Sequence, residues 1–258
     1  MQYILLTIAD SVATITLNRP DKFNAFNRTM ALQLHQALDY CAANNAIRAI
    51  LLTGSGKAFC AGQDLAEVVD PNGPGMNRIL NEHFNPIIQR IVDMPKPIVC
   101  AVNGVAAGAG ANIALVCDVV IAAQGASFIQ AFTKIGLIPD SGGTYTLPKL
   151  IGYQRASALM LLGDKVTATQ AEHMGMVYKV YEDEQLHTTA VAMAQQLAAM
   201  PTMAIAYTKQ ALQAGVSNTI TEQLHTEDVL QQQAAATQDF KEGVTAFIEK
   251  RKPIFVGK

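Results

Sequence analysis

The chain is organised around Ala101-Val-Asn-Gly-Val-Ala-Ala-Gly-Ala-Gly-Ala-Asn-Ile-Ala-Leu115, a stretch rich in glycine and alanine. It follows an apolar run that is typical of a buried strand, and its last residues are typical of the first turns of a buried helix. Because few side chains project between Gly104 and Ala111, another backbone or a ligand can approach closely. The N–H groups that open the helix lack intrahelical partners and lie at the positive end of its dipole. The stretch therefore predicts a site for a negatively charged oxygen.

Composition narrows the class of protein. Half of the 258 residues are apolar and 16% are charged, which allows a sizeable core. Lys and Arg number 19 against 21 Asp and Glu, and no basic stripe stands out, so nucleic acid is not an expected partner. We find no run of eighteen apolar residues and no signal-peptide pattern, so no membrane span is expected. The four cysteines form no CxxC pair, which favours a reducing cytoplasm and argues against zinc.

Hydrophobic periodicity predicts an α/β core with a helical C-terminal extension. The expected strands lie at 3–8, 12–17, 49–53, 119–123 and about 127–132. The expected helices lie at 29–43, 76–92, 154–162, 184–200, 202–214, 219–236 and 239–251. Pro86 is expected to kink or break the second of these helices, and Thr219 with Glu222 has the spacing of a capping box.

The chain does not contain the GxGxxG or P-loop motifs of nucleotide-binding proteins. A GxGxxG motif would need glycine at position 113, where Ile113 stands, and a P-loop would need glycine and Ser/Thr where Leu51 and Ala58 stand. GxSxG is absent, and the five histidines match no metal-binding spacing. Two small-residue loops, 54–65 and 101–111, could instead aim two backbone N–H groups at one point, although such turns are more often only turns.

Three segments in order resemble the signatures of the crotonase (enoyl-CoA hydratase/isomerase) superfamily. They are Gly56-Lys-Ala-Phe-Cys-Ala-Gly-Gln-Asp-Leu65, Lys96-Pro-Ile-Val-Cys-Ala-Val-Asn-Gly-Val-Ala-Ala-Gly-Ala-Gly-Ala111 and Ile135-Gly-Leu-Ile-Pro-Asp-Ser-Gly-Gly-Thr144. Asn18-Arg-Pro and Phe247-Ile-Glu-Lys-Arg-Lys-Pro-Ile-Phe255 match as well, so the resemblance extends over nearly the whole chain. Within the superfamily, the chain most resembles the branch of isomerases that convert ring-1,2-epoxyphenylacetyl-CoA to oxepin-CoA.

The resemblance implies a crotonase-like α/β fold, a right-handed spiral of ββα repeats with a helical C-terminal region that trimerises. We expect residues 1–195 to form the spiral core with the acyl-CoA site, and residues 196–258 to serve oligomerisation. A homotrimer or a dimer of trimers is therefore expected. The ligand would be an acyl-CoA thioester, so coenzyme A is part of the substrate and no separate cofactor or metal is implied.

The resemblance also assigns chemistry to individual residues. The N–H groups of Gln63 and Ala109 would form an oxyanion hole for the thioester oxygen, where losing one donor costs about 2.7–4 kcal/mol in the transition state. Family hydratases act on water with two glutamates, but Asn112 and Phe132 stand at those positions here. Asp140 remains, at a place where related isomerases and dehalogenases carry an aspartate.

Asp140 is the predicted acid and base. One carboxylate in an apolar pocket can take a proton from one carbon and return it at another. Burial by Phe132, Leu137 and Ile138 is expected to raise its pKa. The alternative is that Asp140 caps a helix beginning near Ser141.

Substrate binding is expected from several further residues that match family positions. Lys22, Phe23 and Ala25 would follow the CoA moiety together with Ala61, and Phe247 and Lys250 would reach the CoA site of a neighbouring subunit. Other expected contacts, each with a structural alternative, are Asp64, Asn112 and Phe132. Asp64 could instead support the oxyanion loop, and Asn112 could be a helix residue that is hydrogen-bonded locally. Four aromatic residues are available for an acyl pocket: Phe84, Phe128, Phe132 and Tyr145.

Three functions remain open at this point. The first is an acyl-CoA isomerase that uses Asp140 for a ring-epoxide rearrangement or a double-bond shift. The second is an enoyl-CoA hydratase with an atypical acid/base set. The third is a trimer that binds acyl-CoA without catalysis.

Overall fold

The computed structural model describes residues 2–258, so Met1, the first residue of the expected core region, lies outside it. Its strands are β1 (Ile4–Ala9), β2 (Val12–Leu17), β3 (Ala49–Gly54), β4 (Ala58–Cys60), β5 (Ile98–Val102), β6 (Val105–Ala107), β7 (Val119–Ala123), β8 (Ser127–Ile129), β9 (Lys165–Thr167) and β10 (Lys179–Tyr181). Its α-helices are α1 (Arg28–Ala43), α2 (Leu65–Val69), α3 (Gly75–Arg78), α4 (Asn85–Asp93), α5 (Ala109–Leu115), α6 (Gly143–Ile151), α7 (Tyr153–Leu162), α8 (Ala168–His173), α9 (Asp183–Ala198), α10 (Thr202–Ala214), α11 (Ile220–Ala235) and α12 (Gln238–Ile248).

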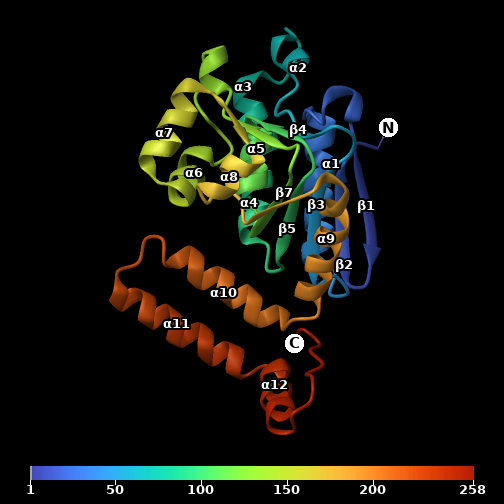
Figure 1. Cartoon of the computed structure of the whole chain (residues 1–258), viewed down its shortest axis with the longest axis vertical. Coiled ribbons are helices and arrows are strands. Elements are labelled where there is room, and N and C mark those ends of the chain that lie inside the picture. The colour runs from blue at the N-terminus through green and yellow to red at the C-terminus, as the bar shows by residue number, and fades with distance from the viewer. Residues whose placement is uncertain (1) are drawn as a thin grey trace.

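Two sheets carry the α/β core. The larger sheet has the order β1-β2-β3-β5-β7-β10, and the smaller has the order β4-β6-β8-β9. β3, β5 and β7 pair in parallel in the larger sheet, while β4, β6 and β8, which follow them in the chain, pair in parallel in the smaller one. A helix follows each such pair of strands, so the chain winds as repeated ββα units (Figure 1). The expected α/β spiral is confirmed.

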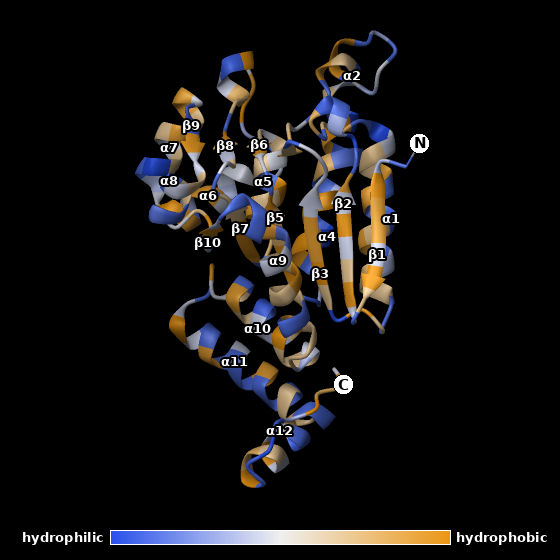
Figure 2. Ribbon diagram, turned by 45° about the vertical axis from the view of Figure 1, so that its right-hand side comes forward, coloured by the Kyte–Doolittle hydropathy of each residue, from blue (hydrophilic) through white to orange (hydrophobic). Residues whose placement is uncertain are grey.

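Burial explains why the larger sheet is stable. Every residue of β5 is buried, as expected for a parallel strand covered on both faces. α9 packs against β2, β3, β5 and β7, and it buries Leu186, Ala190, Ala194 and Ala198, which recur every four residues. Figure 2 shows β1, β2 and β3 largely in the hydrophobic colours. The larger sheet therefore contributes much of the buried core.

The helical C-terminal segment extends away from this core (Figure 1). α10, α11 and α12 lie within a few residues of the predicted helices, and the capping box of Thr219 with Glu222 is present. Arg48 ties the segment to the core, because its guanidinium donates to Thr202 Oγ1, Met200 O and Phe255 O. The expected boundary between residues 195 and 196 falls in the last turn of α9.

Two predicted elements differ from the structure. The strand expected to reach residue 132 ends at Ile129, and a 3₁₀ turn, Phe132–Ile135, follows it. The helix expected over 76–92 is interrupted by a π-helical segment, Ile79–Phe84, and Pro86 stands at the start of α4 beyond it. Within residues 2–258, no helix has the length and apolarity needed to cross a membrane.

Candidate active site

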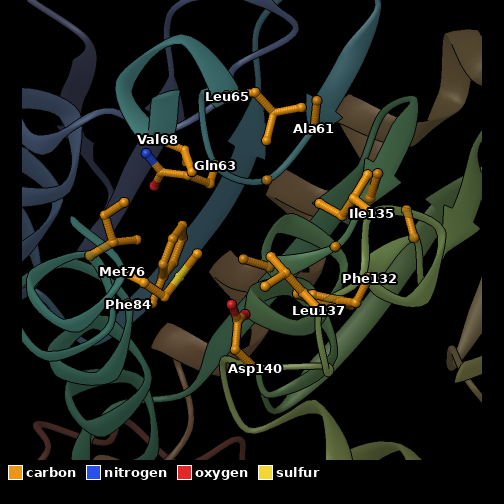
Figure 3. Close-up of a pocket in the computed structure, with 16 residues that line it drawn as sticks. Ala61, Gln63, Leu65, Val68, Met76, Phe84, Phe132, Ile135, Leu137 and Asp140 are labelled. Carbon is orange, nitrogen blue, oxygen red and sulfur yellow. The ribbon is translucent and has the colours of Figure 1, made fainter. Parts of the chain in front are cut away.

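A cavity of about 390 Å³ lies between the small-residue loops (Figure 3). Five of the expected site residues line it: Ala61, Gln63, Ala109, Phe132 and Asp140. The rest of its wall is mostly apolar and consists of Gly62, Leu65, Val68, Met76, Ile79, Phe84, Ala107, Gly108, Ala131, Ile135 and Leu137. The structure thus brings together segments from four regions of the chain.

Two loops meet at one edge of the cavity because β4 and β6 are parallel neighbours, so their carboxyl ends lie side by side. Gly62 has φ +90°, and Gly108 has φ +54° with ψ −129°, conformations that side chains other than hydrogen rarely allow. A Cβ added to Gly62 would lie 3.0 Å from Ala107 O and 3.5 Å from Ala109 N. The two loops are therefore in direct contact.

The N–H groups of Gln63 and Ala109 are available at this contact. Ala109 is the first residue of α5, where an N–H has no intrahelical acceptor. Phe26 N donates to Gly62 O, and Asp64 N donates to Phe26 O, which leaves the Gln63 N–H between them unused. Neither N–H donates to any acceptor that the structure shows within residues 2–258. Two unused N–H groups on adjoining loops are consistent with the predicted oxyanion hole, which stays a prediction.

Cys60 lies beneath both loops. Its Sγ donates to Asn24 O at 3.2 Å and accepts the Gly62 N–H at 3.3 Å. A Cβ added to Gly110 would lie 2.7 Å from the same sulfur, so the start of α5 packs directly on it. Burial raises the pKa of Cys60 to about 12, which keeps the thiol protonated. Cys60 is therefore a packing residue rather than a nucleophile.

Asp140 faces the Ala61–Gln63 loop across the cavity (Figure 3). Its Oδ1 accepts a hydrogen bond of 2.8 Å from Ser141 Oγ. Burial raises the pKa of the Asp140 carboxyl, although the Ser141 hydroxyl and the Asp140 N–H, which both donate to it, oppose the change. A carboxyl with a raised pKa is suited to exchange protons with a carbon acid.

One alternative and one expectation about Asp140 are wrong. α6 begins at Gly143 and has Gly142 at its N-cap without a side-chain bond, so the Asp140 carboxylate does not cap the helix. Ile138 was expected to bury Asp140, but it is 81% exposed and lies outside the cavity lining, in the segment that leaves the 3₁₀ turn at the left-handed Gly136. Phe132 and Leu137 do line the cavity.

The raised pKa predicts how Asp140 affects stability. In the folded state the protonated carboxyl is favoured, so its stabilising contribution is complete below about pH 4, near the unfolded pKa, and is lost as the pH rises through the folded pKa. Asn resembles the protonated form, so Asp140→Asn should be at least as stable as the parent at pH 7, with a difference that disappears towards pH 4. Thermal unfolding between pH 4 and 8 measures this. A parent that is more stable than the variant at pH 7 would contradict the prediction.

Most of the apolar wall could not be predicted from the sequence. Leu65 and Val68 reach the cavity from α2, which was not predicted. Ile79 and Phe84 reach it from the π-helical segment, where the Asn85 N–H bonds to the carbonyl of Leu80, five residues back. The wider turn brings side chains five residues apart onto one wall, and such segments are frequent at functional sites. The one feature of the sequence that indicated this wall was the i, i+3 spacing of Leu65 and Val68, which places both side chains on one face of a helix.

The resemblance implies that Phe132 and Asn112 occupy the positions of the two hydratase glutamates, and the structure places these two residues differently relative to the cavity. Phe132 lines the cavity and is 6% exposed. Asn112 is 1% exposed, lies outside the cavity lining, and uses its amide for bonds to Asp140 O and Gln130. Of the other aromatic candidates, Phe84 lines the cavity, Phe128 is in the core, and Tyr145 is 63% exposed.

The residues expected along the CoA moiety lie near the cavity mouth. Phe23 O accepts the Ala61 N–H at 2.9 Å, which places the exposed turn with Lys22 beside the cavity-lining Ala61. Ala25 is buried behind this turn. Asp64 is not in the cavity lining and forms a salt bridge of 2.7 Å with Arg19.

Asp64 has the partners of a supporting residue. Its Oδ1 caps α2 by accepting the Ala66 N–H. Burial acts to raise the pKa of Asp64, but the hydrogen bond and charge of Arg19 and the Ala66 N–H outweigh burial and lower the pKa. The alternative role, support of the oxyanion loop, accounts for these contacts.

Phe247 and Lys250 are not brought to the cavity of their own chain. Phe247 is 85% exposed near the end of α12, and Lys250 follows it at the surface. α12 lies at the opposite end of the molecule from α2 and α3, which flank the cavity (Figure 1). Any role for these two residues in CoA binding needs a second subunit.

Known proteins resemble this chain over its whole length. The family model for Enoyl-CoA hydratase/isomerase matches residues 7–258. The 1,2-epoxyphenylacetyl-CoA isomerase of Escherichia coli K12 is 46% identical over 261 aligned positions, which cover 100% of both chains. A probable enoyl-CoA hydratase of Rhodobacter capsulatus is also 46% identical, over 97% of this chain and 96% of the relative.

A solved structure agrees with this assignment. The crystal structure of a putative enoyl-CoA hydratase/isomerase from Mycobacterium abscessus superposes with a TM-score of 0.94 and 38% identity, over 99% of this chain and 100% of that one. The fold, the two loops and the full-length matches agree. The chain therefore belongs to the enoyl-CoA hydratase/isomerase family.

Proposed function

We propose that this enzyme is an acyl-CoA isomerase in which Asp140 moves a proton between two carbons of the acyl group. The observation that carries the proposal is the cavity wall, where Asp140 is the one carboxylate among the lining residues and faces the Gln63 loop (Figure 3). The substrates we propose are a 3-enoyl-CoA, converted to the 2-enoyl-CoA, and ring-1,2-epoxyphenylacetyl-CoA, converted to oxepin-CoA. Neither reaction calls for a cofactor beyond the CoA of the substrate.

The proposed chemistry uses groups already in place. The thioester oxygen would accept hydrogen bonds from the N–H groups of Gln63 and Ala109, which favours the enolate formed when the α-proton leaves. Asp140 takes that proton as a base and then returns it at the γ-carbon, so the double bond moves and the carboxylate is regenerated. Because most of the wall is apolar, a bound acyl group would displace water from it and so strengthen these interactions.

The isomerase of Escherichia coli supports the aromatic substrate, since it is 46% identical over the whole chain and its name specifies 1,2-epoxyphenylacetyl-CoA. Phe84 and Phe132 on the cavity wall offer apolar surface for a ring. We propose that both reactions begin with removal of the proton next to the thioester and end with its return, at the γ-carbon of the 3-enoyl chain or, once the bond between the two epoxide carbons has opened, at a carbon of the ring. We therefore propose one site and one acid/base group for both.

Hydration is the second candidate, because the Rhodobacter capsulatus relative, which is named a probable enoyl-CoA hydratase, is also 46% identical to this chain. Addition of water needs a group that activates the water, and family hydratases use a pair of carboxylates. Phe132 and Asn112 provide neither, and Asn112 lies outside the cavity lining. Binding without catalysis is the third candidate, and the presence of the Asp140 carboxylate in the mostly apolar cavity, together with its raised pKa, speaks against it.

A substrate panel separates these three functions. The enzyme is incubated in turn with a 3-enoyl-CoA, a 2-enoyl-CoA and the ring epoxide, and the products are identified by mass and absorbance. The proposal expects products of unchanged mass from the first and third compounds. A product that has gained one water from the 2-enoyl-CoA indicates hydration, and bound but unchanged ligands indicate a protein without catalysis.

We propose that the enzyme works as a homotrimer or a dimer of trimers through residues 196–258. Exposed apolar residues on α11 and α12 support this: Ile220, Leu224, Phe240, Phe247 and Ile248. In that assembly Phe247 and Lys250 would reach the CoA of a neighbouring subunit, while Lys22, Phe23, Ala25 and Ala61 follow it in their own subunit. Sedimentation equilibrium tests the assembly, and a monomer at micromolar concentration would contradict it.

A further inference from the structure

Asn112 links three segments behind the cavity. Its Nδ2 donates to the Asp140 carbonyl at 2.8 Å, and its Oδ1 accepts from Gln130 Nε2 at 2.8 Å. Asn112 belongs to α5 and Gln130 directly follows β8, and they are 1% and 4% exposed. Both ends of the Asn112 amide therefore have protein partners, away from solvent.

The space between α5 and the start of α6 fits a side chain of the length of Asn112. A Cβ added to Gly143 would lie 2.3 Å from Asn112 Nδ2 and 2.8 Å from Asn112 Oδ1. The backbone at the start of α6 thus rests on the amide, which is possible because residue 143 is glycine. A glutamate at position 112 would be one methylene longer, so it would have to displace this backbone or turn away from it.

The segment that carries Asp140 is held mainly by hydrogen bonds, among them one of 3.0 Å from the Leu137 N–H to Phe132 O. Leu137 and Ile138, which precede it, are 36% and 81% exposed, so packing holds them weakly. Ser141 has φ +51°, a strained conformation for a residue with a side chain. The bonds that fix the Asp140 carbonyl are those from Asn112 Nδ2 and from the Gly143 N–H, at 2.9 Å.

We infer that Asn112, held by Gln130, is a positioning residue that fixes the Asp140 backbone and so directs the Asp140 carboxylate at the substrate. This inference rests on the proposed function. It replaces the expectation that Asn112 contacts the substrate. It also gives a physical reason why the position of a hydratase glutamate is occupied by a shorter amide: the residue supports the acid/base group instead of acting on water.

Kinetics of Asn112→Ala test the inference. We expect kcat to fall by about 10- to 100-fold with little change in KM, because a carboxylate misplaced by about 1 Å loses catalytic efficiency without loss of binding. The acidic limb of the kcat profile should stay in place, since no charge is added or removed. Asn44→Ala is the control: its Nδ2 donates to Tyr40 Oη and its Oδ1 accepts the Ala46 N–H, outside the cavity lining and outside residues 196–258, so its kcat should equal that of the parent.

A double variant separates positioning from general destabilisation. If Asn112 acts through Asp140, Asn112→Ala combined with Asp140→Asn should be no slower than Asp140→Asn alone, because residues that act as one unit are not additive. Losses that multiply would overturn the inference, as would an Asn112→Ala kcat within twofold of the parent. Gln130→Met, which removes the second bond and keeps the volume, should show a smaller loss of kcat in the same direction. If Asn112→Ala does not fold, the kcat of Gln130→Met tests the inference instead.

The proposed function and this inference can fail separately. If the parent isomerises none of the substrates, the proposed function fails. If the parent isomerises and Asp140→Asn does not, while Asn112→Ala and Gln130→Met both match the parent, only the positioning role fails.

Discussion

Asp140→Asn is expected to fold and to bind acyl-CoA esters like the parent, but to lose about 10²- to 10⁴-fold in kcat. The amide has the shape of the carboxyl and can still accept the hydrogen bond from Ser141 Oγ, so the cavity should keep its form. It cannot take a proton from the α-carbon. Steady-state kinetics with a 3-enoyl-CoA measure the loss, and calorimetric titration with a saturated acyl-CoA measures binding.

The control for this variant is Asp93→Asn. Asp93 is an exposed carboxylate at the end of α4 whose Oδ2 accepts from Gln89 Nε2, outside the cavity lining. Its kcat should be unchanged. If Asp140→Asn isomerises within a few-fold of the parent, Asp140 is not the acid/base group.

Gly110→Ala is expected to give the second largest loss. The added Cβ would lie 2.4 Å from Cys60 O and 2.7 Å from Cys60 Sγ, and backbone atoms cannot yield as the end of a flexible side chain can. α5 must move away from the loop that follows β4, which separates the N–H of Ala109 from that of Gln63. Disabling one oxyanion donor costs about 10²- to 10³-fold in kcat, and overpacking costs about 1–3 kcal/mol of folding free energy.

Gly243→Ala is the matched control, because Gly243 also lies within a helix and its added Cβ would be 3.5 Å from the Phe255 ring, an ordinary contact. That variant should keep the parent's kcat and fold at least as well, since alanine favours a helix interior by about 1 kcal/mol over glycine. Folded Gly110→Ala with the kcat of the parent would show that the start of α5 is not part of the site.

Local features of the fold could be predicted from the sequence. The capping box of Thr219 with Glu222 depends on residues three apart, and the β1–β2 hairpin depends on alternation within two short runs. The small-residue loops could be recognised because their glycines are needed for the chain to pass close to other backbone. The resemblance implied that the two loops form one site. The structure shows how they meet, because β4 and β6 pair in parallel.

Features that depend on packing between distant segments could not be predicted. The bond from Asn112 to the Asp140 carbonyl joins residues 28 apart and needs Gly143 to lie against the amide. The π-helical segment, Ile79–Phe84, carries an ordinary helical pattern, yet its extra width places Phe84 on the cavity wall. Ile138 is apolar and exposed, so hydrophobicity alone gave the wrong place for it.

The most direct test of the central claim follows a label through the reaction. A 3-enoyl-CoA deuterated at the α-carbon is given to the parent enzyme, and the products of the first turnovers are analysed by mass spectrometry and NMR. If Asp140 moves the proton, the 2-enoyl-CoA product should carry deuterium at the γ-carbon, and Asp140→Asn should form almost none of this product. Recovery of the 3-enoyl-CoA with its deuterium in place, together with conversion of a 2-enoyl-CoA to the 3-hydroxyacyl-CoA, would contradict the account.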